Sequence, residues 1–331
     1  MFLLAHISDP HLGPLPSVRP AEILNKRFFG YLSWQRRRRG VHSPAVLAAL
    51  AEDLAARGAD HLVITGDLTN IALAEEFTQV GAWLRGLGTA DAVSVIPGNH
   101  DAYVAVPWEA SLAHWRAFMT SETDPGGAET PPAGPEDFPF LRFRGPLAIL
   151  GLSSAQPTPL FCAYGTLGEA QLDRLRRLLR ELGEDGWFRV VLLHHPPSLE
   201  GIAWRKRLVD AAAFRRVIAE EGAELVLHGH DHTFGEDRIA AAAGPVPVFG
   251  VPSASAARES KKKPLAHYQT YAIARDGGDW SVQVTARGFD PARGGFHEVR
   301  TDRLAMSGGP ESRPPEGRGS RPAGLSDPAQ R

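Results

Sequence analysis

The sequence predicts an α/β (α+β) fold in which two sheets are flanked by helices. Short runs rich in Val, Ile and Leu alternate with amphipathic stretches that carry helix start and stop signals, a pattern typical of such proteins. Later in the chain the runs become shorter and are separated by Gly and Pro turns, which favours a second, mostly antiparallel layer. The length of 331 residues and a hydrophobic content of 43% allow a sizeable core.

The strands of the first layer are predicted from apolar runs that end in polar residues. These runs cover Phe2–Ile7, His61–Thr65, Ala92–Ile96, Phe188–Leu193 and Ala223–Leu227. The antiparallel layer is predicted from the later segments "PVPVFGVP", "HYQTYAIAR" and "WSVQVTARG".

Helices are predicted where end signals flank an amphipathic stretch. The segment "SPAVLAALAEDLAARG" has Ser43 as N-cap, Pro44 at the first helical position and Gly58 at the exit. Before "AQLDRLRRLLREL", Thr166 and Glu169 have the spacing of a capping box. Two further helices are expected over roughly Leu73–Leu87 and Arg205–Glu220.

One domain is expected over residues 1–305, followed by a disordered tail over 306–331. The tail is rich in Gly, Pro, Ser and Arg and offers almost nothing to bury. Within the domain, Thr120–Asp137 is expected to be a long exposed loop, because it contains "DPGG" and "PPAGPED". The basic run "ESKKKP" at Glu259–Pro264 is also expected to be an exposed loop.

The overall charge argues against a nucleic-acid partner. Lys and Arg number 36 against 38 Asp and Glu, so the formal net charge is -2 and no global field recruits polyanions. The single cysteine, Cys162, excludes an intramolecular disulfide and fits a reducing compartment. The first residues, "MFLLAHISD", lack a basic leader and reach Asp9 early, so a cytoplasmic location is expected, with a peripheral membrane contact left open.

Residues that can bind metal ions follow five of the predicted strands. They are Asp9 and His11 in "AHISDPHLG", Asp67 in "LVITGDLTN", Asn99, His100 and Asp101 in "VSVIPGNHD", His194 and His195 in "VVLLHHPP", and His228 and His230 in "LVLHGHDH". Residues two apart in extended backbone share a face, so His228 and His230 are expected to converge. The carboxyl ends of strands in α/β sheets meet in one crevice. Each motif alone is also an ordinary turn, but turn chemistry does not explain the same ending on five strands.

These residues resemble the calcineurin-like metallophosphoesterases. The ordered pattern of that family is D-x-H, GD, GNH followed by an acid, H before a proline turn, and GHxH, and this chain shows "DPH", "GD", "GNHD", "HHPP" and "GHDH" in that order. The resemblance covers about Met1 to Gly288. It implies a four-layer α-β-β-α sandwich of two mixed sheets flanked by helices, with a dinuclear metal centre at the strand ends.

The resemblance also implies a set of ligands. One ion would be held by Asp9, His11 and His230, the other by Asn99, His194 and His228, and both would be bridged by Asp67. His194 is chosen over His195 because the family ligand stands two residues before the proline. His232 falls outside this assignment and is expected to face solvent or lie near the substrate.

A donor set of carboxylates, an amide and imidazoles without thiolates favours two divalent transition-metal ions, namely Mn, Fe or Zn. Two such cations can lower the pKa of a shared water, orient the hydroxide for attack on phosphorus and neutralise phosphoryl charge. By resemblance, His100 would face the substrate and stabilise an oxygen or protonate the leaving group. Asp101 would orient its ring.

The substrate is expected to be a small phosphoester. The chain looks most like class III cyclic nucleotide phosphodiesterases and glycerophosphodiesterases, which favours a phosphodiester. A phosphomonoesterase or pyrophosphatase acting on a nucleotide or a lipid-linked substrate is the alternative, because such enzymes share the metal set. A metal-bound scaffold that binds partners without catalysis is an alternative of a different class, and the complete ligand pattern argues against it.

The segment Pro20–Gly40, "PAEILNKRFFGYLSWQRRRRG", is an insertion relative to compact family members. Its apolar residues with helical spacing are Leu24, Phe28, Tyr31 and Leu32, and its basic residues are Lys26, Arg27 and Arg36 to Arg39. Three interpretations stay open. They are a helix packed on the domain with a solvated basic end, a lid that helps bind an anionic substrate, and a membrane-surface contact.

Overall fold

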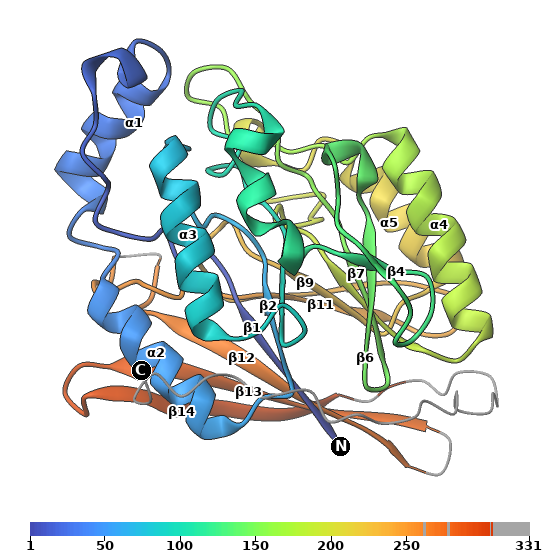
Figure 1. Cartoon of the computed structure of the whole chain (residues 1–331). Coiled ribbons are helices and arrows are strands. Elements are labelled where there is room, and N and C mark those ends of the chain that lie inside the picture. Colours follow the sequence, from blue (N-terminus) through green and yellow to red (C-terminus); the bar gives the residue numbers. More distant parts are fainter. Residues whose placement is uncertain (261–262, 277–278, 305, 307–331) are drawn as a thin grey trace.

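Two six-stranded mixed sheets form the centre of the molecule (Figure 1). The computed structural model describes residues 1–260, 263–276, 279–304 and 306. The first sheet has the order β14 (Gly295–Leu304), β13 (Asp279–Asp290), β12 (His267–Asp276), β1 (Phe2–Ile7), β2 (His61–Ile64) and β3 (Val93–Val95). The second has the order β10 (Gly235–Ile239), β11 (Val246–Gly250), β9 (Leu225–His228), β8 (Phe188–Leu192), β7 (Leu147–Gly151) and β6 (Phe140–Arg144).

Helices cover the sheets from both sides, which confirms the expected four layers. One core joins α2 (Pro44–Arg57) and α3 (Ala74–Leu87) to the first sheet and to the inner face of the second. The other core joins α4 (Glu169–Glu184) and α5 (Ala211–Glu221) to the outer face of the second sheet. Strand β8 shows why its sequence is continuously apolar: Val190 lies in the first core and Val191 in the second.

The predicted strands of the first layer all exist, with ends within two residues of those expected. Strands β6, β7, β10 and β14 were not predicted. The three segments expected to form one antiparallel layer are instead divided between the sheets. The "PVPVFGVP" segment forms β11, which pairs parallel with β9. In the first sheet, β12 pairs antiparallel with β1, and β13 pairs antiparallel with β12.

Two helix predictions need correction. The helix expected from Arg205 begins at Ala211, because the carbonyls of Arg205 and Arg207 accept hydrogen bonds from the backbone of Ala163 and Gly165. Only a short 3-10 turn, η6 (Trp204–Lys206), forms there.

The capping box predicted for α4 is also absent. The Thr166 hydroxyl donates to the carboxylate of Asp210 (2.9 Å), and the N-cap position is taken by Gly168. Helix α2 does begin at Pro44, and Gly58 ends it in the left-handed conformation, as predicted.

The expected loop at Thr120–Asp137 is partly ordered structure. It contains the short strands β4 (Ser121–Glu122) and β5 (Glu129–Thr130) and the turn η5 (Pro135–Asp137). Glu122 is buried and accepts a hydrogen bond from the backbone N–H of Phe143 in β6. Of the predicted tail 306–331, all but Met306 lies outside the described residues, as do residues 261–262 of the basic run.

The 20–40 segment packs on the domain as a series of short helices. They are η1 (Pro20–Ile23), α1 (Arg27–Ser33) and the π-helical η2 (Trp34–Arg38). Two 3-10 helices outside this segment, η3 (Trp108–Ala110) and η4 (Leu112–Phe118), follow β3 in the chain. Lys26 donates to the carbonyls of Thr158 (3.0 Å) and Cys162 (3.2 Å), and Arg27 to that of Ile71 (3.0 Å). Two of its cations are therefore internal anchors. In the described part of the chain, no helix is long and apolar enough to cross a bilayer.

Candidate metal centre

All the predicted ligands except His228 meet at the carboxyl ends of the parallel strands, where the backbone is strained. Among the residues that the structure describes, seven other than glycine have positive φ, and five of them belong to the site: Asp9, His11, Asp67, His230 and His232. Side chains other than glycine rarely adopt this conformation, and it persists only where the surroundings hold it. The concentration of such residues at the strand ends marks a functional site.

Glycines beside these residues allow the loops to approach one another. A Cβ on Gly98 would lie 2.3 Å from Oδ1 of Asp67, and one on Gly66 would lie 2.7 Å from Nδ1 of His194. A Cβ on Gly229 would lie 1.8 Å from Oγ of Ser8. The glycine of each of the motifs GD, GN and GH therefore leaves room for a neighbouring loop.

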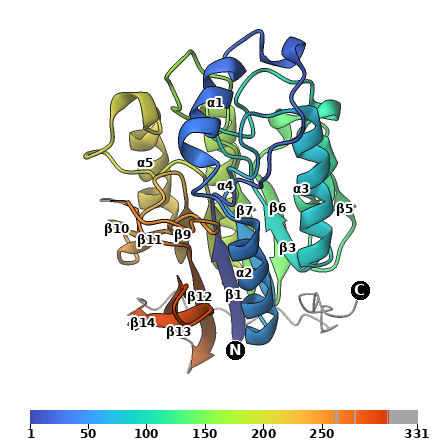
Figure 2. The ribbon, with the colours of Figure 1, turned by 90° about the vertical axis from the view of Figure 1, so that its left-hand side faces the viewer.

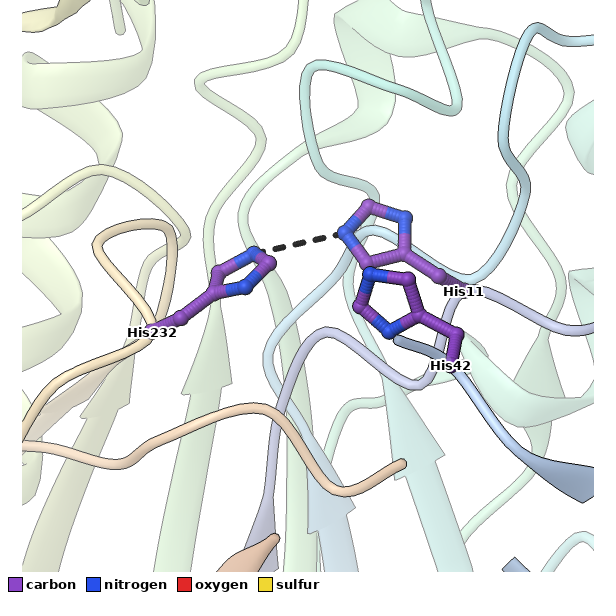
Figure 3. Close-up of side chains that lie close together, drawn as sticks. All are labelled: His11, His42 and His232. Carbon is purple, nitrogen blue, oxygen red and sulfur yellow. Dashed lines mark hydrogen bonds between the residues drawn. The ribbon is translucent and has the colours of Figure 1, made fainter. Parts of the chain in front are cut away.

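One cluster of ligand atoms contains Asp9, His11, Asp67 and His232, all within 4.8 Å of one another. Nε2 of His232 lies 3.1 Å from Oδ1 of Asp9, and Nε2 of His11 lies 3.8 Å from Oδ2 of Asp67. The Nε2 atoms of His11 and His232 face each other at 3.3 Å (Figure 3). This cluster can hold one cation.

A second cluster contains Asp67, His194 and His230. Nε2 of His194 lies 3.4 Å from Oδ1 of Asp67 and 3.2 Å from Oδ1 of Asn99. Asp67 belongs to both clusters, with Oδ2 on the side of His11 and Oδ1 on the side of His194. This arrangement suits a carboxylate that bridges two cations.

The hydrogen bonds of the site fit metal ions. His11 and His194 each have Nδ1 on a backbone carbonyl, Thr69 at 3.1 Å and Thr65 at 2.6 Å, which places the ring proton on Nδ1. In the neutral rings, the Nε2 lone pairs then face carboxylate oxygens, so either a second ring proton or a metal cation must lie between them. Both ring nitrogens of buried His230 lack a hydrogen-bond partner within the described ranges. The donor set therefore fits a dinuclear divalent metal centre.

The charges of the site point the same way. Burial opposes the charged form of His194, but the Asp67 carboxylate outweighs it and raises the pKa of His194 to about 9. Burial likewise opposes the ionised form of Asp9, yet His232 lowers the pKa of its carboxyl. The buried carboxylates therefore demand positive charge close by.

The geometry differs from the expected ligand set at two histidines. His228 ends β9 and shares the face of Val226, which packs under the helices, so its ring lies against Gly250 and its Nδ1 is 3.1 Å from the carbonyl of Gly229. The chain leaves the extended conformation after His228, because His230 has positive φ, and the expected convergence of these two rings does not occur. His232, expected near solvent or substrate, lies in the first cluster instead, and His230 lies in the second.

The sequence contained a signal for the choice of His230 and His232 as the two ligands of the GHxH motif. Gly229 is the residue that must be a glycine, so the GH pair is Gly229 with His230, and the second histidine of GHxH is His232.

Two other histidines lie beside the clusters. His195 has both ring nitrogens occupied, Nδ1 by the hydroxyl of Ser154 (2.7 Å) and Nε2 by the carbonyl of Ala163 (3.1 Å), which supports the choice of His194. His42 forms a third group with His11 and His232, and Figure 3 shows its ring beside that of His11. Its Nδ1 is 2.7 Å from Oγ of Ser255. No pattern in the sequence pointed to His42.

His100 lies at the open side of the clusters. Its backbone N–H donates to Oδ1 of Asp67 (2.7 Å), its Nδ1 is 2.6 Å from the carbonyl of Asn70, and its ring stacks on Tyr103. Burial lowers the pKa of its ring to about 4, against the opposing effect of Asp67.

Asp101 does not orient the ring of His100, contrary to expectation. Its carboxylate accepts hydrogen bonds from the backbone N–H groups of Leu68 (3.0 Å), Thr69 (2.8 Å) and Gly98 (2.8 Å). Burial and the nearby Asp67 raise its pKa to about 7. Asp101 therefore ties the loop after β2 to the loop after β3, which positions Asp67 and Asn99.

Comparison with known proteins agrees with the dinuclear metal centre that the geometry suggests. A family model described as calcineurin-like phosphoesterase matches residues 2–234. Over 197 residues the chain is 28% identical to a Synechococcus sp. protein described as a probable cyclic nucleotide phosphodiesterase, and the match covers 59% of this chain and 66% of that protein's length.

Two solved structures share the fold. A dimetal phosphatase from Danio rerio has a TM-score of 0.55 at 14% identity, covering 92% of this chain and 99% of that one. A purple acid phosphatase from yellow lupin (Lupinus luteus) has a TM-score of 0.54 at 10% identity, covering 91% of this chain and 53% of that one.

Proposed function

The chain belongs to the calcineurin-like phosphoesterase family, and on this premise we propose that it hydrolyses a phosphodiester of the cyclic nucleotide or glycerophosphodiester type. The observation that supports this most is the place of Asp67, whose carboxylate belongs to two ligand clusters at once. A diester substrate is favoured by the description of the Synechococcus relative.

The proposed ligands follow the geometry of the two clusters. Asp9, His11 and His232 would hold one ion, Asn99, His194 and His230 the other, and Asp67 both. We propose Mn, Fe or Zn, because the donors combine carboxylate, amide and imidazole. Two such cations would supply Lewis acidity toward the phosphoryl group and a nucleophilic water at neutral pH.

The protein itself positions the reacting groups. Asp101 fixes the loops that carry Asp67 and Asn99, and Asp67 in turn holds the backbone of His100. Because Nδ1 of His100 is occupied by the carbonyl of Asn70, Nε2 is the ring atom that can face a substrate oxygen. With a second proton on Nε2, as the imidazolium, His100 would there stabilise the phosphoryl oxygens or give that proton to the leaving alkoxide.

The test is a comparison of two chromogenic substrates with purified protein reconstituted with Mn. We expect bis(p-nitrophenyl) phosphate to be cleaved faster than p-nitrophenyl phosphate, because the diester offers a second ester group to bind. Cyclic nucleotides and glycerophosphodiesters are then compared side by side. Faster cleavage of the monoester would refute the diester proposal and favour a monoesterase. If protein that holds two ions cleaves no phosphoester, the alternative of a metal-bound scaffold that binds partners without catalysis would be favoured.

A phosphomonoesterase or pyrophosphatase acting on a nucleotide or lipid-linked substrate is the second candidate. Its support is the exposure of large apolar side chains on the 20–40 segment and the adjacent loop, namely Leu24, Phe28, Phe29, Leu160 and Phe161. The ring of Phe29 lies 5.9 Å from that of Phe161, so the two segments meet. Such a surface could receive the apolar part of an amphiphilic substrate.

A further inference from the structure

A cleft of about 610 Å³ opens under the 20–40 segment and reaches His100. In Figure 2, β1 rises from the N-terminus and α1 lies above the far end of this strand. The proposed metal ligands Asp9 and His11 follow that end of β1 in the chain. The apolar side chains that line the cleft include Phe29, Leu160 and Phe161, and the positively charged ones are Lys26, Arg36, Arg37, Arg38 and Lys206. None of the proposed metal ligands lines it. The cleft is therefore a separate compartment that joins the metal centre at His100.

Arg38 is the cation at the inner end of this cleft. Its Nη1 lies 3.2 Å from Nδ1 and 3.4 Å from Nε2 of His100, and its Nη2 lies 3.4 Å from the carbonyl of Gly30. Its buried Nε has no hydrogen-bond partner within the part of the chain that the structure describes. Burial lowers the pKa of this guanidinium, and Asp67 and Glu76 oppose that effect by charge alone, without a hydrogen bond to Arg38.

The other inward-facing cations of the segment are satisfied. Lys26 donates to three oxygens of Thr158 and Cys162 and lies over the ring of Tyr103. Arg27 donates to the carbonyls of Ile71 and Ala72. Because these residues anchor the segment, Arg38 is not needed for that purpose. A half-buried guanidinium whose inner nitrogen lacks a partner is costly unless an anion completes its surroundings.

We propose that Arg38 is the anchor of an anion subsite, in which a second, non-reacting anionic group of the phosphoester substrate binds beside His100. The proposal rests on the proposed function and narrows its substrate class. A guanidinium can give two parallel hydrogen bonds to a phosphate or carboxylate, and Arg36, Arg37 and Lys206 add positive charge along the same cleft. The apolar wall suits a ring or hydrocarbon in the body of the substrate. The subsite thus favours a phosphoester that carries a further phosphate or carboxylate.

The experiment is calorimetric binding of two nucleotides to the Mn-loaded protein, thymidine 5′-monophosphate and thymidine 3′,5′-bisphosphate. They differ by one phosphate. Hydrogen bonds to charged groups are worth about 1.5–3 kcal/mol, so we expect wild-type protein to bind the bisphosphate at least about tenfold more tightly. Arg38→Ala should lose this preference, and Arg38→Lys should keep only part of it. Arg39→Gln is the matched control. This substitution also removes one positive charge, but from the exposed end of the segment, outside the cleft.

The variants must hold two ions per chain and unfold at the wild-type urea concentration, so that a loss of binding is not a loss of folding. Two results would overturn the proposal: no preference for the bisphosphate in the wild type, or an equal loss of affinity for both nucleotides in Arg38→Ala, which would place Arg38 at the reacting phosphate. Binding needs no turnover. If the protein binds the bisphosphate tightly through Arg38 but cleaves no phosphoester, the proposed function is refuted while the proposal of an anion subsite stands.

Discussion

His232 and Asp9 face each other across 3.1 Å, from Nε2 to Oδ1, although the two residues lie at opposite ends of the family-matched part of the chain. His228, by contrast, is occupied by its own surroundings at Gly229 and Gly250. His232 is therefore the better metal ligand of the two.

Replacing these two histidines should separate their roles. We expect His232→Ala, reconstituted with Mn and desalted, to retain about one ion per chain, because the first cluster loses one of its nitrogen donors. The matched variant His228→Ala should retain about two ions. Metal content is measured by mass spectrometry of the desalted protein. One ion in His228→Ala together with two in His232→Ala would restore the ligand set expected from the sequence.

His100→Ala should keep both ions and lower turnover by about a hundredfold or more, the usual contribution of a positioned acid or charge stabiliser. The reason is that the His100 backbone, which the substitution preserves, is the part that contacts Asp67, whereas its Nε2 faces the substrate side. Turnover of the diester and metal content are measured on the same preparation. Loss of the ions along with turnover would make His100 a ligand.

Asp101→Ala should destabilise the fold, because it leaves buried N–H groups of Leu68, Thr69 and Gly98 without their acceptor. Unsatisfied buried donors cost about 1–3 kcal/mol, so we expect the free energy of unfolding to fall by at least about 2 kcal/mol in urea titrations. Asp137→Ala is the control, since its carboxylate accepts two similar bonds in an exposed turn. An equal fall in the free energy of unfolding in the two variants would mean that the link that Asp101 makes between the two loops adds no particular stability.

The sequence was most informative for ligands that directly follow a strand with a clear apolar pattern. Asp9, His11, Asp67, Asn99 and His194 follow strands whose apolar runs are plain, so their meeting at one edge could be predicted. The partition of the later histidines could not, because it depends on where β9 ends and on the positive φ of His230, which follow from packing of Gly229 on Ser8.

Contacts between distant segments were the hardest to predict. Arg38 lies in a segment whose sequence indicated only a basic, partly helical insertion, and His42 follows that segment, yet their side chains reach His100 and His11. The division of the late strands between two sheets likewise depends on β12 pairing with β1, a partner more than 250 residues earlier in the chain. Period and composition give the face of a strand but do not name its neighbour.

The last prediction concerns the exposed surface of the 20–40 segment. Since Lys26, Arg27 and Arg38 point inward, only Arg36, Arg37 and Arg39 are left to attract anionic lipid, at about 1 kcal/mol each. Leu24, which is 83% exposed, and the half-exposed Phe28 and Phe29 add some apolar area. A few weak terms of this kind give at most marginal attachment, because stable anchoring needs two strong signals.

We therefore expect no salt-sensitive co-sedimentation of wild-type protein with liposomes of mixed neutral and anionic phospholipid. The assay compares about 50 mM with about 200 mM salt, because attraction between surface charges is screened more strongly at the higher concentration. The variant with Arg36, Arg37 and Arg39 changed to Gln should behave like the wild type. Sedimentation of the wild type that salt weakens and that the variant lacks would contradict this expectation. It would show that the exposed arginines bind the membrane surface, and it would favour the lipid-linked substrate over the small diester, because the mouth of the cleft would then open onto the headgroup region.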